Sequence, residues 1–155
     1  GFCRRRNIVL LFCFKKGLGC AMMDFKTITD LVLERIRADA YFHDFKVMSA
    51  FAPVQKPTLP EQPAVLCGVL QANAQTAALG EDVQAGQITV FADVYVPFDQ
   101  CGFDFEHTAG RIFGALCRDT PVSIGANGIR ADEACECFVM RLTVTFSGAL
   151  TFHDE

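Results

Sequence analysis

The triplet Cys135-Glu136-Cys137 is the feature of the sequence that most suggests chemistry. In a β-strand, residues two positions apart project to the same side, so the two thiols would lie together. With Cys101, Cys117 or His107 they could complete a zinc site, because zinc is bound by thiolate and imidazole groups. The chain has no paired C-x2-C spacing, however, and that spacing is typical of structural zinc sites. We therefore expect ordinary thiols here, with a zinc site and a strained or redox disulfide as the alternatives.

Asp104, Glu106 and His107 are a second group that could do acid–base chemistry. They fall at a predicted helix start, where a carboxylate caps free N–H groups and acidic side chains favour the helix dipole. A cysteine nucleophile paired with a histidine is a further arrangement to consider, and no local motif supports it. The sequence contains no G-x-S-x-G, no P-loop and no H-E-x-x-H. We expect the chain not to be an enzyme and to have no catalytic residue, no metal ligand and no cofactor.

Length and composition indicate one globular domain. The 155 residues are 51% hydrophobic and 21% charged, and the formal net charge of -4 is spread along the chain. This balance argues against a nucleic-acid groove, which needs clustered basic residues. The chain has enough apolar residues to form a core without disulfides, so we expect its eight cysteines to be free thiols in a reducing compartment. Cys67 and Cys117 lie in apolar runs and are interpreted as small buried hydrophobes.

Residues 1–22 differ from the rest of the chain. Arginines at positions 4 to 6 precede an apolar run from Ile8 to Phe14, which a lysine pair then ends. A signal peptide has a similar basic start, and Gly17-Leu18-Gly19-Cys20 weakly resembles a lipoprotein cleavage site. The run is far too short to span a bilayer, which needs about 20 apolar residues. We expect an amino-terminal extension ahead of the domain, with Met22 or Met23 as a natural start.

The first half of the remaining chain predicts a helix and three strands. A helix is expected over Asp24–Ala40, with Thr27 and Asp30 as a capping box and an apolar stripe facing the core. Three strands are expected, over Phe45–Ala52, Ala64–Leu70 and the alternating segment Gln87–Phe98. Because Ala64–Leu70 is an apolar run, we expect this strand to be covered on both faces. The proline-rich stretch Pro53–Pro63 is expected to be an extended arm or loop, and Gln71–Gly86 a long hairpin connection. The helix stripe is Ile28, Leu31, Val32 and Ile36.

The second half predicts a helix over Asp104–Arg118, a short strand over Val122–Arg130 and a last strand over Glu136–Leu150. The fold class is therefore α+β, a mainly antiparallel sheet with two helices on one face, in the order α-β-β-β-α-β-β. Two helices cannot cover both faces of such a sheet. We expect the face that carries Phe91 and Tyr95 to be partly open, and so to need a partner or a covering loop.

The segment from Met23 to Phe152 resembles the tail terminator (tail completion) proteins of long-tailed bacteriophages and prophages. The resemblance lies in the order of four features. An opening helix beginning Thr27-Ile28-Thr29-Asp30-Leu31-Val32-Leu33 leads to a strand. A proline-rich stretch then enters the apolar strand at residues 63–69. A strand that ends in tyrosine and proline follows, over residues 87–97. A helix with Phe113 precedes the closing segment Arg141-Leu142-Thr143-Val144-Thr145-Phe146.

This resemblance implies a structural role. Such proteins form a ring, commonly of six subunits, at the head-proximal end of the tail tube, where the ring stops tube growth and faces the head connector. The implied partners are the chain itself, the tail tube protein and the head–tail connector protein, with no sequence recognition of nucleic acid and no membrane. The implied location is the virion tail, and the host cytoplasm during assembly.

We expect the functional domain to span residues 23–152 and the contacts to lie on its two long loops and its open sheet face. A different neck or minor tail component is the alternative within this class. A zinc-binding or thiol-dependent enzyme using Cys135 and Cys137 is the alternative from another class. The predicted contact residues are Pro57, Leu59, Pro60, Gln75, Leu79, Phe91 and Tyr95.

Overall fold

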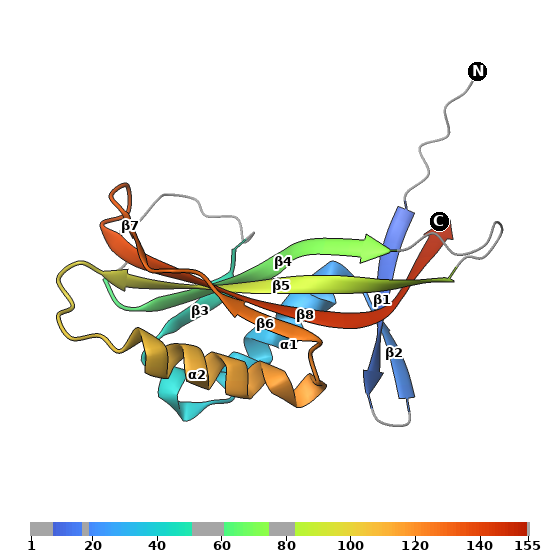
Figure 1. Cartoon of the computed structure of the whole chain (residues 1–155), viewed down its shortest axis with the longest axis horizontal. Helices are drawn as coiled ribbons and strands as arrows, with labels where there is room; N and C mark the ends of the chain where they lie inside the picture. The colour runs from blue at the N-terminus through green and yellow to red at the C-terminus, as the bar shows by residue number, and fades with distance from the viewer. Residues whose placement is uncertain (1–7, 17–18, 51–60, 75–82, 155) are drawn as a thin grey trace, which may run out of the picture.

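A computed structural model of the chain describes residues 8–16, 19–50, 61–74 and 83–154, with side chains described over residues 24–50, 61–73 and 86–148. Within these ranges the protein is an α+β domain with two α-helices and one mixed, mostly antiparallel sheet (Figure 1). The predicted fold class is confirmed. Between residues 24 and 148 the order is α-β-β-β-α-β-β-β, one strand more than expected.

The extra strand arises because the predicted segment Val122–Arg130 is divided. β6 (Ser123–Ala126) and β7 (Arg130–Asp132) pair with different parts of β8 (Cys137–Asp154). The bend between β6 and β7 contains Asn127 and Gly128, a pair that favours turns.

The sheet is arranged around β8. One edge of β8 pairs with the whole length of β5 (Val83–Pro97). The other edge of β5 pairs with β4 (Ala64–Ala74). The other edge of β8 pairs successively with β7, β6 and β1 (Ile8–Lys16), and β1 pairs with β2 (Gly19–Met23). The described strands of the amino-terminal segment, β1 and β2, therefore belong to the sheet, at a place in the chain where an extension ahead of the domain was expected.

β3 (Lys46–Ser49) is the sheet's only parallel member among the described strands, and it lies beside β4. Parallel neighbours cannot be joined by a tight turn and need a connection of about a dozen residues or more. Residues 50–63, which include the proline-rich stretch, make this connection. The loop between β4 and β5 is shorter than predicted, because the strands extend to Ala74 and from Val83.

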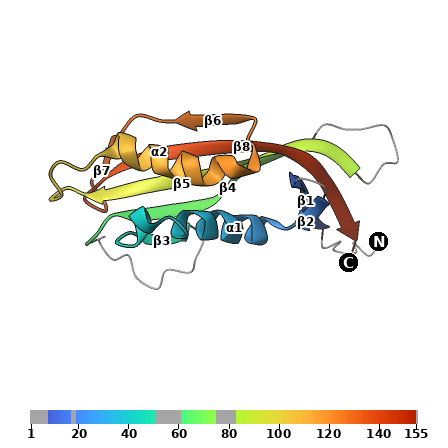
Figure 2. The same ribbon diagram turned by 90° about the horizontal axis from the view of Figure 1, so that it is seen from below.

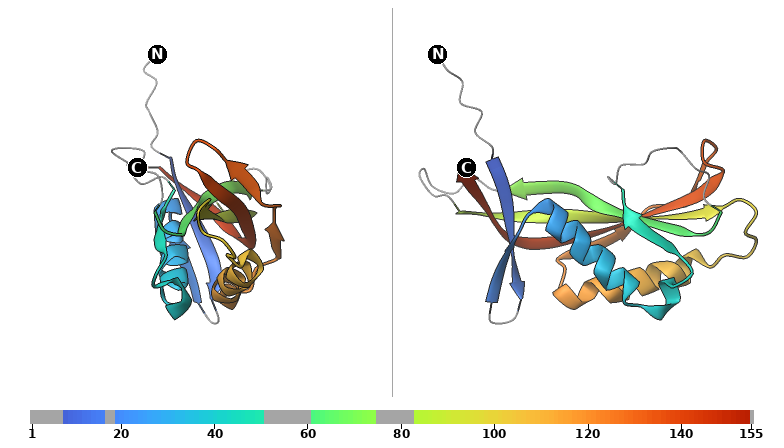
Figure 3. Two further views of the ribbon diagram at one scale, coloured as in Figure 1. Left: turned by 90° about the vertical axis from the view of Figure 1, so that its left-hand side faces the viewer. Right: turned by 180° about the vertical axis from the view of Figure 1, so that it is seen from behind.

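Both helices lie on the same side of the sheet (Figures 1 and 3). α1 (Phe25–Arg37) and α2 (Phe105–Leu116) bury their apolar stripes against alternate residues of β4, β5 and β8. Two 3-10 turns follow the helices, η1 (Ala40–Phe42) and η2 (Cys117–Asp119). The core of this layer comprises Ile28, Val32, Ile36, Val65, Cys67, Ile88, Val90, Ala92, Val94, Val96, Ile112, Leu116, Leu142 and Val144.

Some details of the predicted elements are wrong. The amino-terminal cap of α1 is Asp24, whose carboxylate accepts a hydrogen bond from the Thr27 N–H at 2.7 Å, so Thr27 and Asp30 are not a capping box. A bulge after Val69 exposes Leu70, so β4 is not covered on both faces along its whole length. Cys67 is buried as predicted, whereas Cys117 is exposed.

Candidate functional site

The two cysteines of the triplet do not lie side by side in a strand as predicted. β8 begins at Cys137, and Cys135 lies in the preceding turn, where Glu136 has a φ of 53°. The Cys137 thiol donates to the Cys135 carbonyl at 3.3 Å, and the Cys135 thiol donates to the Asp132 carbonyl at 3.7 Å. Both thiols are thus held by backbone groups of the same turn.

The environment of these thiols makes them poor nucleophiles. Burial raises the pKa of Cys135 above its usual value, and burial with the neighbouring Cys135 raises the pKa of Cys137 to about 12. Both thiols are therefore protonated near neutral pH, whereas a cysteine nucleophile or a zinc ligand must be a thiolate. Among the residues whose positions are described, no group of three His, Cys, Asp or Glu is placed to hold a metal ion.

The Asp104, Glu106 and His107 group begins a helix, as predicted. The Asp104 carboxylate accepts a hydrogen bond from the His107 N–H at 2.9 Å. The His107 ring packs edge-on against Tyr41, with 5.1 Å between ring centroids, and the Tyr41 hydroxyl is 2.8 Å from the Thr108 hydroxyl. These contacts attach η1 to the first turns of α2.

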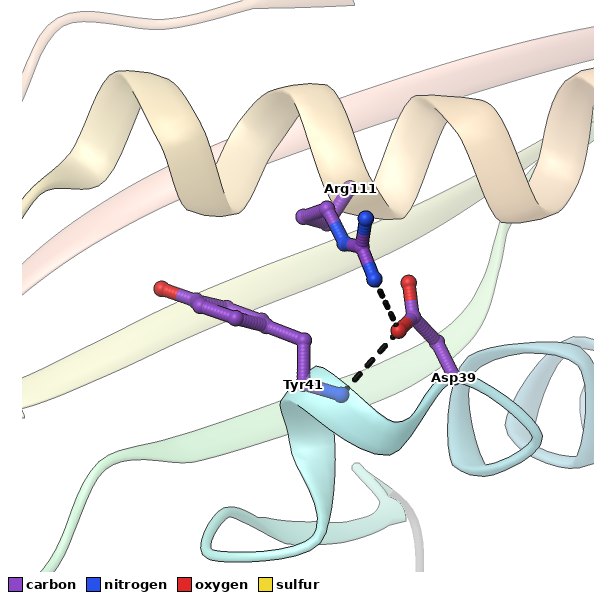
Figure 4. Close-up of polar contacts among 3 residues, drawn as sticks. All are labelled: Asp39, Tyr41 and Arg111. Atoms are coloured by element: carbon purple, nitrogen blue, oxygen red, sulfur yellow. Dashed lines mark hydrogen bonds and ion pairs between the residues drawn. The ribbon is translucent and has the colours of Figure 1, made fainter.

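A groove of about 470 Å³ lies between the end of α1 and the outer side of α2. Figure 4 shows its central contact, in which the Asp39 carboxylate accepts hydrogen bonds from Arg111 at 2.5 Å and from the Tyr41 N–H at 3.0 Å. The hydrogen bond from the Tyr41 backbone N–H lowers the pKa of Asp39 most, and the hydrogen bond from Arg111 lowers it further. Asp39 is therefore an ionised carboxylate near neutral pH. The groove is lined by Arg35, Ala38, Asp39, Ala40, Gly110, Arg111, Gly114, Ala115 and Arg118.

Most of the charge in this groove is already neutralised. Arg111 is held by Asp39, and Arg35 lies 3.3 Å from Asp119. No nucleophile and no free general base lines the groove. Its ion pairs tie α1 and η1 to α2 and η2, so the groove is best understood as the seam between the two helical segments.

The sheet face opposite the helices carries a partly buried ion pair that was not predicted from the sequence. The Arg141 guanidinium forms a two-pronged pair with Asp93, with its Nε and Nη2 at 2.8 and 2.9 Å from the two carboxylate oxygens. Asp93 is 4% exposed. The same guanidinium lies 4.6 Å from the centroid of the Phe91 ring. The pair could be found only from the register of β5 against β8, which places Asp93 opposite Arg141.

The two predicted contact residues on this face differ in accessibility. Phe91 is 5% exposed and packs under Arg141, so the expected open phenylalanine is buried in this chain. Tyr95 is half-buried, and burial raises the pKa of its hydroxyl, which therefore stays protonated. The other predicted contact residues, Pro57, Leu59, Pro60, Gln75 and Leu79, lie outside the described residues.

A group of exposed apolar residues around β6 was also not predicted from the sequence. Val122, Ile124 and Ile129 are each more than half exposed. The available signal was an uncharged run from Thr120 to Ile129 in a chain that is 21% charged. Edge strands commonly carry charges that prevent association, so an uncharged edge is a candidate contact surface.

Comparison with known proteins adds no identification. A scan of protein-family models found no match to this sequence, and a search of curated proteins found none either. No helix of the described part of the chain is long and apolar enough to cross a membrane.

Proposed function

We propose that this protein is a structural tail protein of a long-tailed phage or prophage, a tail terminator that forms a ring of six copies. In this proposal the ring lies at the head-proximal end of the tail tube, in the virion or, during assembly, in the host cytoplasm. It ends tube growth and joins the tube to the head–tail connector protein. The proposal rests on the ordered sequence features of residues 23–152, and one observation of the fold carries it further.

That observation is a sheet much longer than its helical layer. At about 3.3 Å per residue, the 18 residues of β8 span about 60 Å, whereas the 13 residues of α1 span about 20 Å. β5 and β8 continue beyond α2 together with β1 and β2 (Figure 1). This β-arm supplies contact area at one end of the sheet, which suits a protein that binds other subunits.

Two of the predicted contact residues are connected to this arm. Gln75 and Leu79 lie in the segment that joins the end of β4 to the start of β5. Pro57, Leu59 and Pro60 lie in the connection between β3 and β4. In this proposal both connections carry contacts to other subunits.

The alternatives differ in partner and in chemistry. Another neck or minor tail component would bind a different partner from the tail tube protein. A zinc-binding or thiol-dependent enzyme would need reactive thiols at Cys135 and Cys137, and the raised pKa values of both thiols disfavour that reading.

The test is the solution mass of the purified, reduced protein by light scattering, with negative-stain images of the same peak and a parallel sample mixed with tail tubes. We expect rings of six copies, alone or at tube ends. In the same assay, Leu79→Asp should reduce ring formation, whereas Glu61→Gln, in an exposed position outside the predicted contacts, should not. A chain that forms no ring in either sample would overturn the proposal.

A further inference from the structure

β6 is an edge strand that the rest of the described chain leaves uncovered. It pairs with β8 on one side only, and Figure 2 shows it at the outer margin of the sheet, beyond α2. Val122 and Ile124 are 52% and 51% exposed, and Ser123 and Ala126 are exposed as well. The strand therefore presents both backbone groups and apolar side chains to the outside.

The neighbouring edges with described side chains are protected. On β3, the outward-facing carbonyl of Val47 accepts a hydrogen bond from the Arg37 guanidinium, and exposed Lys46 adds a charge. β7 begins and ends with the charged residues Arg130 and Asp132. Such devices prevent strands from pairing with other chains. β6 has four residues and none of them is charged, which makes it a candidate pairing surface.

The hydrogen-bond pattern identifies the groups that β6 offers. The Asn127 N–H donates to the Arg141 carbonyl at 2.9 Å, and the register aligns Gly125 with Thr143. Because backbone groups alternate in direction along a strand, the N–H and C=O groups of Ile124 and Ala126 point away from β8. A side chain at Gly125 would meet the Thr143 hydroxyl at 3.0 Å, so glycine allows β6 to lie this close to β8.

We propose that β6 pairs antiparallel with β6 of a second copy of this chain, about a two-fold axis through Gly125. In this register Ile124 lies opposite Ala126 of the second copy, and the outward N–H and C=O groups of each complete those of the other. The larger isoleucine faces the smaller alanine, so the apolar side chains fit. Two copies with net charge -4 repel each other in general, and the uncharged β6 surface brings no like charges together.

The charged residues beside β6 are compatible with this contact. Asp119, before the uncharged run, is already paired with Arg35, and Arg130 follows the run. An antiparallel alignment keeps the Arg130 ends of the two copies apart, whereas a parallel alignment would place them together, so the charges favour the antiparallel arrangement.

This contact goes beyond the proposed function. A two-fold contact uses the same patch on both copies and closes as a dimer, whereas a ring of like-oriented subunits needs two different patches. The β6 contact is therefore separate from the ring contacts expected on the long loops and the β-arm. It joins the two sheets into one continuous sheet through β8, β6, and their equivalents in the second copy.

The first experiment is sedimentation of the full-length chain over a range of concentrations, for the wild type and for Ile124→Lys. The substituted lysines of the two copies would be diagonal neighbours, and like charges across a strand pair are destabilising. We expect Ile124→Lys to raise the dimer Kd by roughly tenfold or more. Leu70→Lys is the matched control, since Leu70 is also an exposed strand residue (46%) and lies on β4. It should leave the Kd unchanged.

The second experiment is amide hydrogen exchange at low and high protein concentration. The amides of Ile124 and Ala126 should become protected as the dimer forms, while the Gly125 amide, which faces β8, should be protected at both concentrations. A dimer that Ile124→Lys does not weaken would overturn the inference. A six-membered ring with unprotected Ile124 and Ala126 amides would also overturn it, while supporting the proposed function.

Discussion

Asp93 and Arg141 illustrate how a single pair of residues can determine local structure without contributing a reaction. Asp93 is buried on the strand β5, and its two carboxylate oxygens are both used by Arg141 of β8. The hydrogen bonds that Arg141 donates to Asp93 raise the pKa of Arg141 further, so this cation stays charged throughout the accessible pH range. A buried ion pair contributes little net stability compared with apolar residues in its place. Removing one partner is costly, however, because the other charge is then left buried without a counter-charge. We therefore expect the pair to favour this register of β5 against β8 more than it adds stability.

The first prediction concerns the loss of one partner. Arg141→Met should lower the free energy of unfolding by about 3 kcal/mol, because it leaves a buried carboxylate without its cation. The double variant Asp93→Leu with Arg141→Met should regain most of the loss. Urea unfolding followed by circular dichroism measures both.

The control for this prediction is Arg111→Met, which breaks a pair with a more exposed arginine (46% exposed side chain). It should cost about 1 kcal/mol or less, since exposed pairs are screened by water. Equal losses for Arg111→Met and Arg141→Met would contradict the distinction drawn between the two pairs.

The second prediction concerns the thiols. Burial, with a smaller contribution from the charge of Asp93, raises the pKa of Cys67 to about 12, and burial raises that of Cys137 to about 12. Iodoacetamide at pH 8 should therefore alkylate exposed Cys101 and Cys117 in the folded protein and spare Cys67 and Cys137. Peptide mass spectrometry before and after unfolding in urea locates the modified residues. Rapid labelling of Cys137 in the folded chain would revive the thiol-enzyme alternative.

At the scale of elements, the helices are positioned by capping carboxylates. Asp104 was predictable as a cap because it directly precedes an apolar stripe with the helical period. Asp24 was not selected, because Thr27 and Asp30 offer a similar pattern three residues later. The structure separates the two possibilities, since the Thr27 N–H donates to Asp24. Sequence patterns locate the start of a helix to within one turn. Only the observed hydrogen bond to a backbone N–H identifies the capping residue.

The third prediction tests this cap. Asp24→Ala should lower the free energy of unfolding by about 1 kcal/mol at pH 7, whereas Asp30→Ala should have little effect. Hydrogen bonds from the Thr27 hydroxyl and N–H lower the pKa of Asp24 below its usual 3.8. The cap's contribution is therefore present above about pH 4 and is lost as the pH falls through the lowered pKa. The difference between wild type and Asp24→Ala should shrink towards zero once the pH is below this lowered pKa, in urea titrations at several pH values. A difference that persists there would contradict a carboxylate cap.

The strands show which elements a sequence can predict. The alternation in Gln87–Phe98 and in Glu136–Leu150 correctly predicted the strands β5 and β8, in which one face packs against the helices. The same rule did not find β1. Its apolar run lacks a period of two, and such a run does not distinguish a strand from a helix or a signal segment.

At the scale of the whole molecule, the arrangement of the sheet depends on contacts far apart in the sequence. β8 pairs with β1, the first described strand, across almost the full length of the chain. Local patterns carry no information about such pairing. The fold class was therefore predictable from the element pattern, whereas the strand order, the parallel position of β3 and the uncovered edge of β6 were not. The same holds for the candidate contact surface on β6. Its apolar residues are visible in the sequence, but their position on an edge strand depends on the strand order.

The last prediction concerns the contribution of the amino-terminal strands to the whole fold. Residues 24–148 contain both helices, strands β3, β4 and β5, most of β8, and a hydrophobic core that includes Ile28 and Phe146. A chain beginning at Met23 should therefore keep a cooperative unfolding transition and lose less free energy of unfolding than Ile36→Ala, which should lose about 3 kcal/mol. What it should lose is local, because the end of β8 gives up its pairing with β1. Amides of residues 149–154 should exchange faster while those of residues 138–146 stay protected. A shortened chain without a cooperative transition would instead show that β1 and β2 are needed for the domain to fold.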